Sequence, residues 1–381
     1  MEPDVGWGWR EPDVGGIGEN LTWVGWREPD VGGVGENPTW VGLEDPMQVI
    51  QQKAVKSLAG DKVVGQAAVI AEPGRIEVKQ TTFCAPVTGE VRVQLEGCGV
   101  CASNLPVWEG QPWFQYPLEP GAPGHEAWGR VDAIGPDVYD VLPGQRVALL
   151  SSHAYAEYDI CRSCDLVVLP AALNGFDFPG EPLGCAMNIF RRCEIEAGDN
   201  VAIVGIGFLG ALLTQMAVNA GAKVFAISRR QEPLALAKRF GAAETFQSDD
   251  AERTKKLVMA ATFGCGCDCV IEAAGTQATL DLATELTGVR GRLVIAGYHQ
   301  DGPRQVNMQL WNWRGLDVIN AHERDTQVYV RGMKEAIGAI CAGLLDPAPL
   351  YTHHFALDQL SDAFVAMTER PGEFMKGLLI L

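Results

Sequence analysis

The stretch Val201-Ala202-Ile203-Val204-Gly205-Ile206-Gly207-Phe208-Leu209-Gly210 decides the fold of this chain. Its four leading apolar residues predict a buried strand, the glycines predict a tight turn, and residues 211–220, closed by Gly221, predict a helix. A second strand is expected over 223–227. Because this strand–turn–helix–strand unit contains a G-x-G-x-x-G fingerprint, the sequence predicts a dinucleotide site at the N-terminus of the helix.

The three glycines of the fingerprint have separate predicted roles. Gly205 would make the tight turn, Gly207 would let the backbone approach a pyrophosphate, and Gly210 would allow the helix to pack closely on the strand. Phe208 and Leu209 stand between them and belong to the same predicted site.

The residues after the fingerprint continue an alternation of strands and helices. A helix is expected over 231–240, with Pro233 tolerated in its first turn, and strands are expected over 269–271 and 292–295. This alternation predicts a parallel sheet with helices on both faces. The carboxyl edge of such a sheet should hold the nicotinamide. The expected contact residues there are Ala274, Gly275, Ala296 and Gly297.

The end of the second predicted strand carries Ser228, Arg229 and Arg230. A site for NAD usually has Asp or Glu at this point, which accepts from the ribose 2′-hydroxyl. Without that carboxylate a 2′-phosphate is not repelled, and a guanidinium group attracts it, so the sequence favours NADP(H). The alternative is that both arginines are solvated surface charges.

The part of the chain before the fingerprint has a different pattern. Segments 66–70, 90–95 and 145–150 are short, rich in β-forming residues and bounded by Gly, Pro or Asp. They predict an antiparallel, barrel-like β domain.

The first residues of the chain contain a repeat. Residues 9–25 recur almost unchanged at 26–42, and the segment is rich in Gly, Pro and acidic residues. Such a composition cannot bury enough apolar surface to offset the entropy of ordering, so we expect 1–46 to be disordered. An interaction tag built on the repeated tryptophans is the alternative.

The composition is that of a soluble protein with room for two domains: 381 residues, 47% of them hydrophobic and 20% charged. A formal net charge of −18 repels polyanions, so neither nucleic acid nor an acidic membrane surface is an expected partner. No secretory leader opens the chain, and a cytoplasmic location is the default expectation. Eleven cysteines, an odd number, favour reduced thiols over a disulfide framework.

Three residues that precede the fingerprint are candidate ligands of a metal ion: Cys101, His125 and Glu181. One thiolate, one imidazole and one carboxylate leave the fourth tetrahedral position of a zinc ion free for water or substrate, as a catalytic site requires. Each residue also has a simpler interpretation, respectively a buried thiol, a capped loop histidine and a surface acid. Sequence separation alone does not bring them together.

Two CxxC pairs, Cys98 with Cys101 and Cys161 with Cys164, raise the alternative of a structural zinc bound by four thiolates. About 60 residues separate the pairs, against roughly 15–20 in a compact site of that kind. The spacing therefore disfavours it.

Residues 66–381 resemble the medium-chain dehydrogenase/reductase superfamily, in its zinc alcohol dehydrogenase type. The resemblance is carried by GVCASN at 99–104, GHE at 124–126, EPLGCA at 181–186 and GIGFLG at 205–210. It implies an α/β protein with a GroES-like β-barrel catalytic domain and a Rossmann coenzyme-binding domain built on a doubly wound parallel sheet. The implied bounds are 60–184 with 325–381 for the catalytic domain and 185–324 for the coenzyme domain.

The same resemblance implies that Cys101, His125 and Glu181 bind one catalytic zinc ion, with no structural zinc. Glu126 would be the nearby acid that visits the metal during ligand exchange, and Ser103 would be the hydroxyl beside the substrate oxygen. The resemblance further implies a homodimer or homotetramer that acts on a small-molecule alcohol or carbonyl substrate.

Two positions depart from the pattern of the family. Asn104 replaces the usual Asp, so the carboxylate expected behind the ligands is neutral here. Pro106 stands where the family has the histidine that finishes its proton relay, and a proline side chain cannot accept a proton. His153 is a candidate substitute for this histidine, and a polar role in the pocket wall or a loop is the simpler interpretation.

We therefore predict an oxidoreductase that interconverts an alcohol or polyol and its carbonyl, with zinc and NADP(H). The alternatives are a metal-free quinone or enoyl reductase of the same fold and a nucleotide-binding scaffold without turnover. Aromatic residues that would wall the substrate pocket, or simply pack, are Trp108, Trp113, Phe114 and Tyr116.

Overall fold

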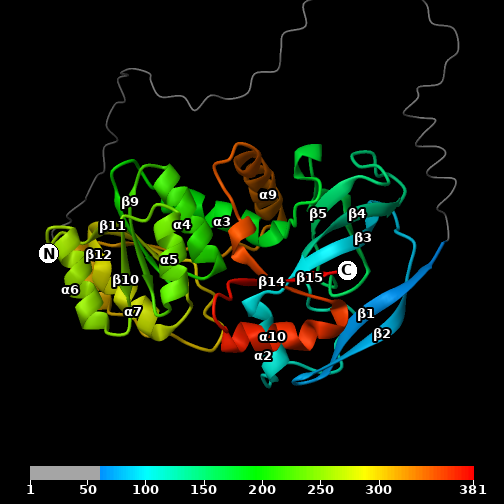
Figure 1. Cartoon of the computed structure of the whole chain (residues 1–381), viewed down its shortest axis with the longest axis horizontal. Helices are drawn as coiled ribbons and strands as arrows, with labels where there is room; N and C mark the ends of the chain where they lie inside the picture. Colours follow the sequence, from blue (N-terminus) through cyan, green and yellow to red (C-terminus); the bar gives the residue numbers. More distant parts are fainter. Residues whose placement is uncertain (1–60) are drawn as a thin grey trace, which may run out of the picture. The chain divides into compact units, whose positions relative to one another are not determined.

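The computed structural model of the protein describes residues 61–381, and the segment 1–46 predicted to be disordered lies outside this range. The described residues belong to one compact unit. They form a parallel six-stranded sheet, a seven-stranded sheet and a two-stranded sheet (Figure 1). Among them, no helix combines the length and the apolarity that a bilayer span requires.

The six-stranded sheet has the strand order β10-β9-β8-β11-β12-β13, and all of its neighbouring strands are parallel. The strands are β8 (Asn200–Val204), β9 (Lys223–Ser228), β10 (Glu244–Gln247), β11 (Cys267–Glu272), β12 (Thr287–Ile295) and β13 (Asp317–Asn320). Residues 201–204 are at most 1% exposed, as expected of a strand covered on both faces. The chain continues from β8 to β9 on one side and later returns to β11 on the other. Open parallel sheets bind ligands at such a switch point.

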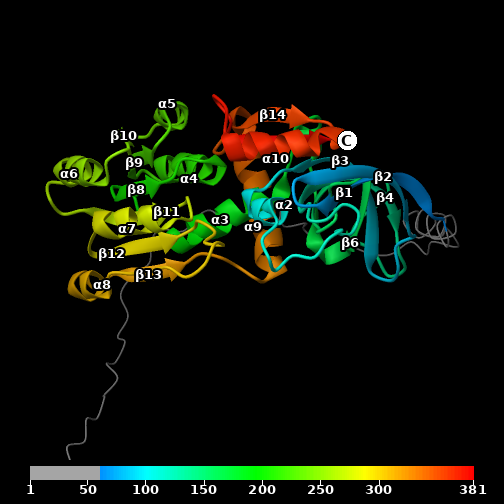
Figure 2. The same ribbon diagram turned by 90° about the horizontal axis from the view of Figure 1, so that it is seen from below.

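Helices cover both faces of this sheet (Figure 2). They are α4 (Phe208–Asn219), α5 (Gln231–Arg239), α6 (Ala251–Ala261), α7 (Gln277–Leu286) and the short α8 (Met308–Arg314). Ile203 packs in one core with residues of α4 and α5, whereas Val204 packs in another with residues of α6 and α7. The predicted parallel sheet with helices on both faces is confirmed. The helix after the fingerprint begins earlier than predicted, so Gly210 is already helical.

The seven-stranded sheet is mostly antiparallel, and a parallel pair of β14 with β15 is the exception to the predicted pattern. Its strands are β3 (Glu90–Gly99), β4 (Glu126–Ile134), β5 (Arg146–Leu150), β6 (Tyr158–Arg162), β7 (Leu166–Val168), β14 (Tyr351–Phe355) and β15 (Lys376–Ile380). β15 pairs with β3, so the last residues of the chain lie beside the strand that leads to Cys101. A hairpin of β1 (Val63–Glu72) and β2 (Arg75–Phe83) is joined to the region by a bridge between Ala67 and Ala156.

Helices and short turns complete this part of the chain. They are α2 (Leu105–Glu109), α3 (Gly180–Cys193), α9 (Thr326–Cys341) and α10 (Leu360–Glu369), with the 3-10 turns η1 (Ala102–Asn104), η2 (Ser163–Asp165), η3 (Ala171–Leu173), η4 (Ala348–Leu350) and η5 (Leu357–Gln359). α3 and α9 approach closely because both lack a side chain at the contact: a Cβ on Gly332 would lie 2.4 Å from the carbonyl oxygen of Gly184. The domain boundary expected between residues 184 and 185 falls inside α3.

Candidate active site

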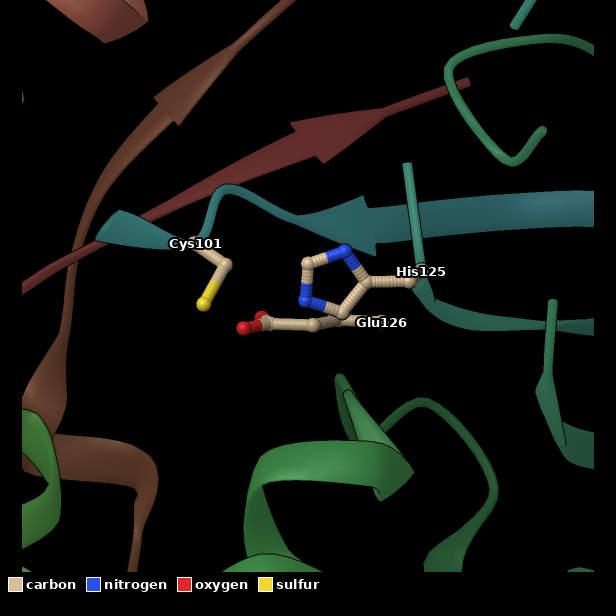
Figure 3. A group of neighbouring side chains, drawn as sticks. All are labelled: Cys101, His125 and Glu126. Carbon is tan, nitrogen blue, oxygen red and sulfur yellow. The ribbon is translucent and has the colours of Figure 1, made fainter. Parts of the chain in front are cut away.

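Cys101, His125 and Glu126 form a cluster where β3 ends and β4 begins, between central strands of the seven-stranded sheet (Figure 3). Each offers a ligand atom, and these atoms all lie within 4.8 Å of one another. The pairing of β3 with β4 explains the convergence, because Gly99 lies opposite Glu126 in the register. Cys101 follows β3 by two residues, and His125 immediately precedes β4. The structure thus brings together two of the predicted ligands and the predicted nearby acid.

The imidazole of His125 is oriented by the backbone of Pro123. Its Nδ1 lies 2.9 Å from the Pro123 carbonyl oxygen, which leaves Nε2 available as a ligand atom. Burial lowers the pKa of His125, but the hydrogen bond and charge of Cys101, together with the charges of Glu181 and Glu126, outweigh burial and raise the pKa to about 10. The cluster therefore attracts positive charge. A thiol, an imidazole and carboxyl groups are also the donors that zinc prefers.

Glu181 lies in the first turn of α3 and is not part of the group within 4.8 Å. Burial raises its pKa to about 7, while the charge of His125 lowers the pKa and that of Glu126 raises it. Glu181 therefore lies outside the group but near enough for the charges of His125 and Glu126 to act on it. Cys185 follows one helical turn later, and burial followed by the charges of Glu181 and Cys101 raises the pKa of its thiol. α3 thus directs two potential ligands toward the same region.

A buried lysine neutralises Glu126. Nζ of Lys376 lies 2.7 Å from Oε1 and 2.5 Å from Oε2 of Glu126, and the two residues are 6% and 0% exposed. Burial lowers the pKa of Lys376, but the charge of Glu126 raises it above its usual value. Both carboxylate oxygens of Glu126 therefore face the Lys376 ammonium group, which already supplies a positive charge at this position. Sequence reasoning missed Lys376, although a single charge within the apolar run 374–381 was a usable signal.

Asn104 contacts the same carbonyl group that orients His125. Its Nδ2 donates to the Pro123 oxygen at 2.9 Å, while its buried Oδ1 has no partner in the described part of the chain. The neutral amide therefore acts on the backbone acceptor instead of on the imidazole. Ser103 is half-buried in η1, and Pro106 is buried in α2.

His153 has partners of its own away from the cluster. Its Nε2 lies 2.9 Å from Oε2 of Glu119, and its Nδ1 lies 3.1 Å from Oγ of Ser152. Trp113, expected in the pocket wall, is 59% exposed. The other three aromatic residues pack against the core of the β-rich region: Trp108, Phe114 and Tyr116.

Three glycines shape the turn between β8 and α4. Gly205 has a φ of +106°, and a Cβ there would lie 2.9 Å from Cβ of Ala274. A Cβ on Gly210 would lie 2.0 Å from the carbonyl oxygen of Gly205, whereas one on Gly207 would meet no atom within 4 Å. The fold itself therefore requires Gly205 and Gly210. Gly207 is the N-cap of α4, and the open space above it forms a cradle at the helix N-terminus, a kind of place where anions commonly bind.

The predicted nicotinamide contacts lie in two turns that touch each other, after β11 and after β12. A Cβ on Gly297 would lie 2.3 Å from the backbone nitrogen of Gly275, and a Cβ on Gly275 would lie 2.8 Å from the carbonyl oxygen of Tyr298. Since Ala274 also packs on Gly205, the fingerprint and both turns form one continuous edge.

Three arginines gather at the end of β9. Arg229 and Arg230 follow the buried Ser228, and Arg370 ends α10. Burial and the charge of Arg370 lower the pKa of Arg230, and burial and the charge of Arg229 lower the pKa of Arg370. None of the three forms an ion pair with a carboxylate of residues 61–381. Glu232 is a nearby acid, since its charge raises the pKa of Arg230, and Nη1 of Arg230 donates to the Phe374 carbonyl oxygen at 2.9 Å. A group of neighbouring cations with few counter-charges is suited to bind an anion. Sequence reasoning missed Arg370, whose position along the chain gives no sign of this contact.

Comparisons with known proteins show which proteins the chain resembles. The profile described as "Alcohol dehydrogenase GroES-like domain" matches residues 87–221, and the profile described as "Zinc-binding dehydrogenase" matches residues 209–337. Galactitol 1-phosphate 5-dehydrogenase of Escherichia coli (strain K12) is 31% identical over 245 residues, which cover 56% of this chain and 69% of that protein.

Solved structures resemble the chain over most of its length. Galactitol-1-phosphate dehydrogenase from Escherichia coli matches with a TM-score of 0.72 at 25% identity, covering 83% of this chain and 100% of that one. 2R,3R-butanediol dehydrogenase from Bacillus subtilis matches with a TM-score of 0.73 at 22% identity, covering 83% and 99%. At 22% identity, the similarity to butanediol dehydrogenase shows a shared fold alone.

Proposed function

Because the chain belongs to the zinc-type alcohol and polyol dehydrogenases of the medium-chain dehydrogenase/reductase superfamily, we propose that it interconverts an alcohol or polyol and its carbonyl with one zinc ion and NADP(H). The family resemblance, the fold class and the oxidoreductase class predicted from the sequence are confirmed.

The proposed zinc ligands are the Cys101 thiolate, the His125 imidazole and the Glu181 carboxylate. Glu181 lies outside the cluster and would reach it by a change of side-chain rotamer. A zinc ion bound there supplies the Lewis acidity that lowers the pKa of a substrate hydroxyl. The chain supplies orientation, since the Pro123 carbonyl fixes the imidazole plane. Glu126, the third member of the cluster, is the proposed carboxylate for ligand exchange.

Ser103 is the proposed acceptor of the substrate proton. Its half-buried hydroxyl lies two residues after Cys101, and a hydroxyl group can both accept and donate a proton. Pro106 offers no such group, and His153 is paired with Glu119. We therefore propose that Ser103 takes the substrate proton and passes it on toward water.

The dinucleotide is proposed to lie along the carboxyl edge of the parallel sheet. Its pyrophosphate would occupy the cradle at Gly207, where the N–H groups of the first turn of α4 have no side-chain cap. Its 2′-phosphate would lie near Ser228 among Arg229, Arg230 and Arg370, which supports NADP(H) over NAD(H). The nicotinamide would then face the turns that contain Ala274, Gly275, Ala296 and Gly297.

A homodimer or homotetramer is proposed on the basis of the exposed edge of the parallel sheet. β13 ends the sheet, and the neighbouring α8 exposes Met308 and Trp313 by 52% and 86%. We also propose catalytic and coenzyme domains at 60–184 with 325–381 and at 185–324. A cytoplasmic location is proposed because all eleven cysteines are free thiols.

The convergence of Cys101, His125 and carboxyl groups is the observation that carries this proposal. The test measures the rate of NADP⁺-linked oxidation of secondary alcohols and sugar alcohols. Nicotinamide absorbance monitors this rate before and after the protein is dialysed against a chelator. Activity lost on dialysis and restored by zinc is the expected result. Undiminished activity of metal-free protein would favour a quinone or enoyl reductase, and absence of turnover across alcohols and aldehydes would favour a nucleotide-binding scaffold.

A further inference from the structure

Glu272, the last residue of β11, holds both turns at the carboxyl edge and is 0% exposed. Its Oε1 accepts hydrogen bonds from the backbone N–H groups of Ala274 at 2.9 Å and Gly275 at 2.8 Å. Its backbone carbonyl accepts from the N–H groups of Ala296 and Gly297, both at 2.8 Å. One residue therefore sets the position of the turn after β11 and of the turn after β12.

His299 occupies the other oxygen of this buried carboxyl group. Its Nε2 lies 3.0 Å from Oε2 of Glu272, and its side chain is 14% exposed. On the opposite side of the ring, Nε of Arg304 donates to Nδ1 at 2.8 Å. A guanidinium group can only donate, so Nδ1 of His299 must accept, and the neutral ring carries its proton on Nε2. That proton is donated to Glu272.

The same loop is connected to the turn after β11 and to the metal cluster. Arg304 donates from Nη2 to the carbonyl oxygen of Gly275 at 3.0 Å and pairs with Asp301. Gln300, the neighbour of His299, lies with Nε2 3.4 Å from the carbonyl oxygen of Ala102, between Cys101 and Ser103. A displacement of this loop would therefore alter both the turn after β11 and the segment that carries Cys101 and Ser103.

We propose that His299 is a positioning residue for the nicotinamide end of the coenzyme, acting through Glu272 and Arg304. The inference rests on the proposed function, because it requires a dinucleotide at this edge. Without the imidazole, Oε2 of Glu272 and Nε of Arg304 lose their partners in a buried place. The turns that contain Gly275 and Gly297 then populate other arrangements, and coenzyme affinity falls with the fraction of the competent one.

The test compares NADPH binding and steady-state kinetics in the full-length zinc enzyme and its variants. His299→Leu should raise the dissociation constant of NADPH and the KM for NADP⁺ about tenfold, with the KM for the alcohol and the zinc content unchanged. His299→Gln should restore most of the affinity, because an amide can accept from Arg304 and donate to Glu272. His354→Leu is the matched control: His354 pairs with Asp177 at 3.3 Å on the surface, and its loss should leave both constants unchanged.

If His299→Leu binds NADPH as tightly as the unaltered protein, the inference about His299 is overturned, but the proposed function is not. The inference is also overturned if His299→Gln binds NADPH as weakly as His299→Leu, because the loss of affinity would then not come from the hydrogen bonds. Failure of the unaltered protein to bind NADPH or NADH would overturn the proposed function and the inference with it. If His299→Leu does not fold, Arg304→Met takes its place. This variant should raise the NADPH dissociation constant by a smaller factor, and an unchanged dissociation constant would overturn the inference.

Discussion

Nζ of Lys376 lies 2.7 Å from Oε1 of Glu126, in a buried ion pair that joins the C-terminal strand β15 to β4. The same ammonium group lies 5.2 Å from the ring centre of Phe208, the first residue of α4. One side chain therefore links the proposed zinc cluster to the glycine turn. This link explains why the last residues of the chain are part of the site.

The first prediction concerns this ion pair. Lys376→Met should lower the free energy of unfolding by about 3 kcal/mol, because Glu126 is left buried without its counter-charge. Denaturant unfolding measures the loss. Lys79→Met is the control: Lys79 pairs with Glu77 at 2.7 Å, but the side chains are 51% and 35% exposed, so its loss should stay below about 1 kcal/mol. Losses of equal size for the two variants would contradict the structural role of the buried pair.

A second prediction concerns Asn104, which acts on His125 through the Pro123 carbonyl. Asn104→Ala should weaken zinc binding by about tenfold, because the carbonyl that orients the imidazole loses one of its two donors. Competition with a chromogenic chelator measures the affinity. Asn188→Ala removes an equally buried amide that donates to the Ala321 carbonyl at 3.1 Å away from the cluster, and should leave zinc affinity unchanged. A similar drop in both variants would point to general loss of stability.

The third prediction tests the cation group at the end of β9. Arg370→Ala should raise the KM for NADP⁺ about tenfold and leave the KM for NAD⁺ nearly unchanged, because only NADP⁺ carries the 2′-phosphate. Arg331, which is 66% exposed and pairs with Glu335, supplies the control variant Arg331→Ala. A uniform change with both coenzymes would assign Arg370 to the fold instead of to the phosphate.

A fourth prediction separates two glycines of the fingerprint. Gly207→Ala should cost less than about 1 kcal/mol of stability, since alanine is a poorer N-cap and the methyl group meets no protein atom. It should weaken NADPH binding, because the methyl group fills the cradle. Gly210→Ala should destabilise the protein by about 1–3 kcal/mol, because the methyl group collides with the Gly205 carbonyl. Calorimetry measures the stability of both variants, and a fluorescence titration measures their NADPH affinity. Full NADPH affinity in the Gly207 variant would refute the proposed place of the pyrophosphate.

The parallel sheet could be predicted from the sequence because its signals are local. Residues 201–204 are apolar enough for burial on both faces, and Gly205 and Gly210 mark the turn and the close packing of α4. Cys101 and His125 could be proposed as partners only with the help of a family resemblance. Their convergence depends on the register between β3 and β4, which spacing along the chain does not reveal.

Other parts of the site depend on contacts between distant segments. Lys376 meets Glu126 because β15 returns to β3. The charge of Arg370 acts on Arg230 because the segment after α10 returns to the end of β9, where Nη1 of Arg230 donates to the Phe374 carbonyl oxygen. The bond between His299 and Glu272 likewise requires adjacent turns of β11 and β12. Glu181 illustrates the opposite limit, since its motif suggested a ligand but its side chain lies outside the group within 4.8 Å. Its role as a ligand stays a prediction.

The most direct test of the account is an anomalous difference map at the zinc absorption edge, measured on crystals of the full chain with bound NADPH. We predict one strong peak per chain within bonding distance of Cys101 Sγ and His125 Nε2, with a carboxylate of Glu181 completing the protein ligands. A catalytically active crystal without a peak at this cluster, or with zinc bound only elsewhere, would contradict the account.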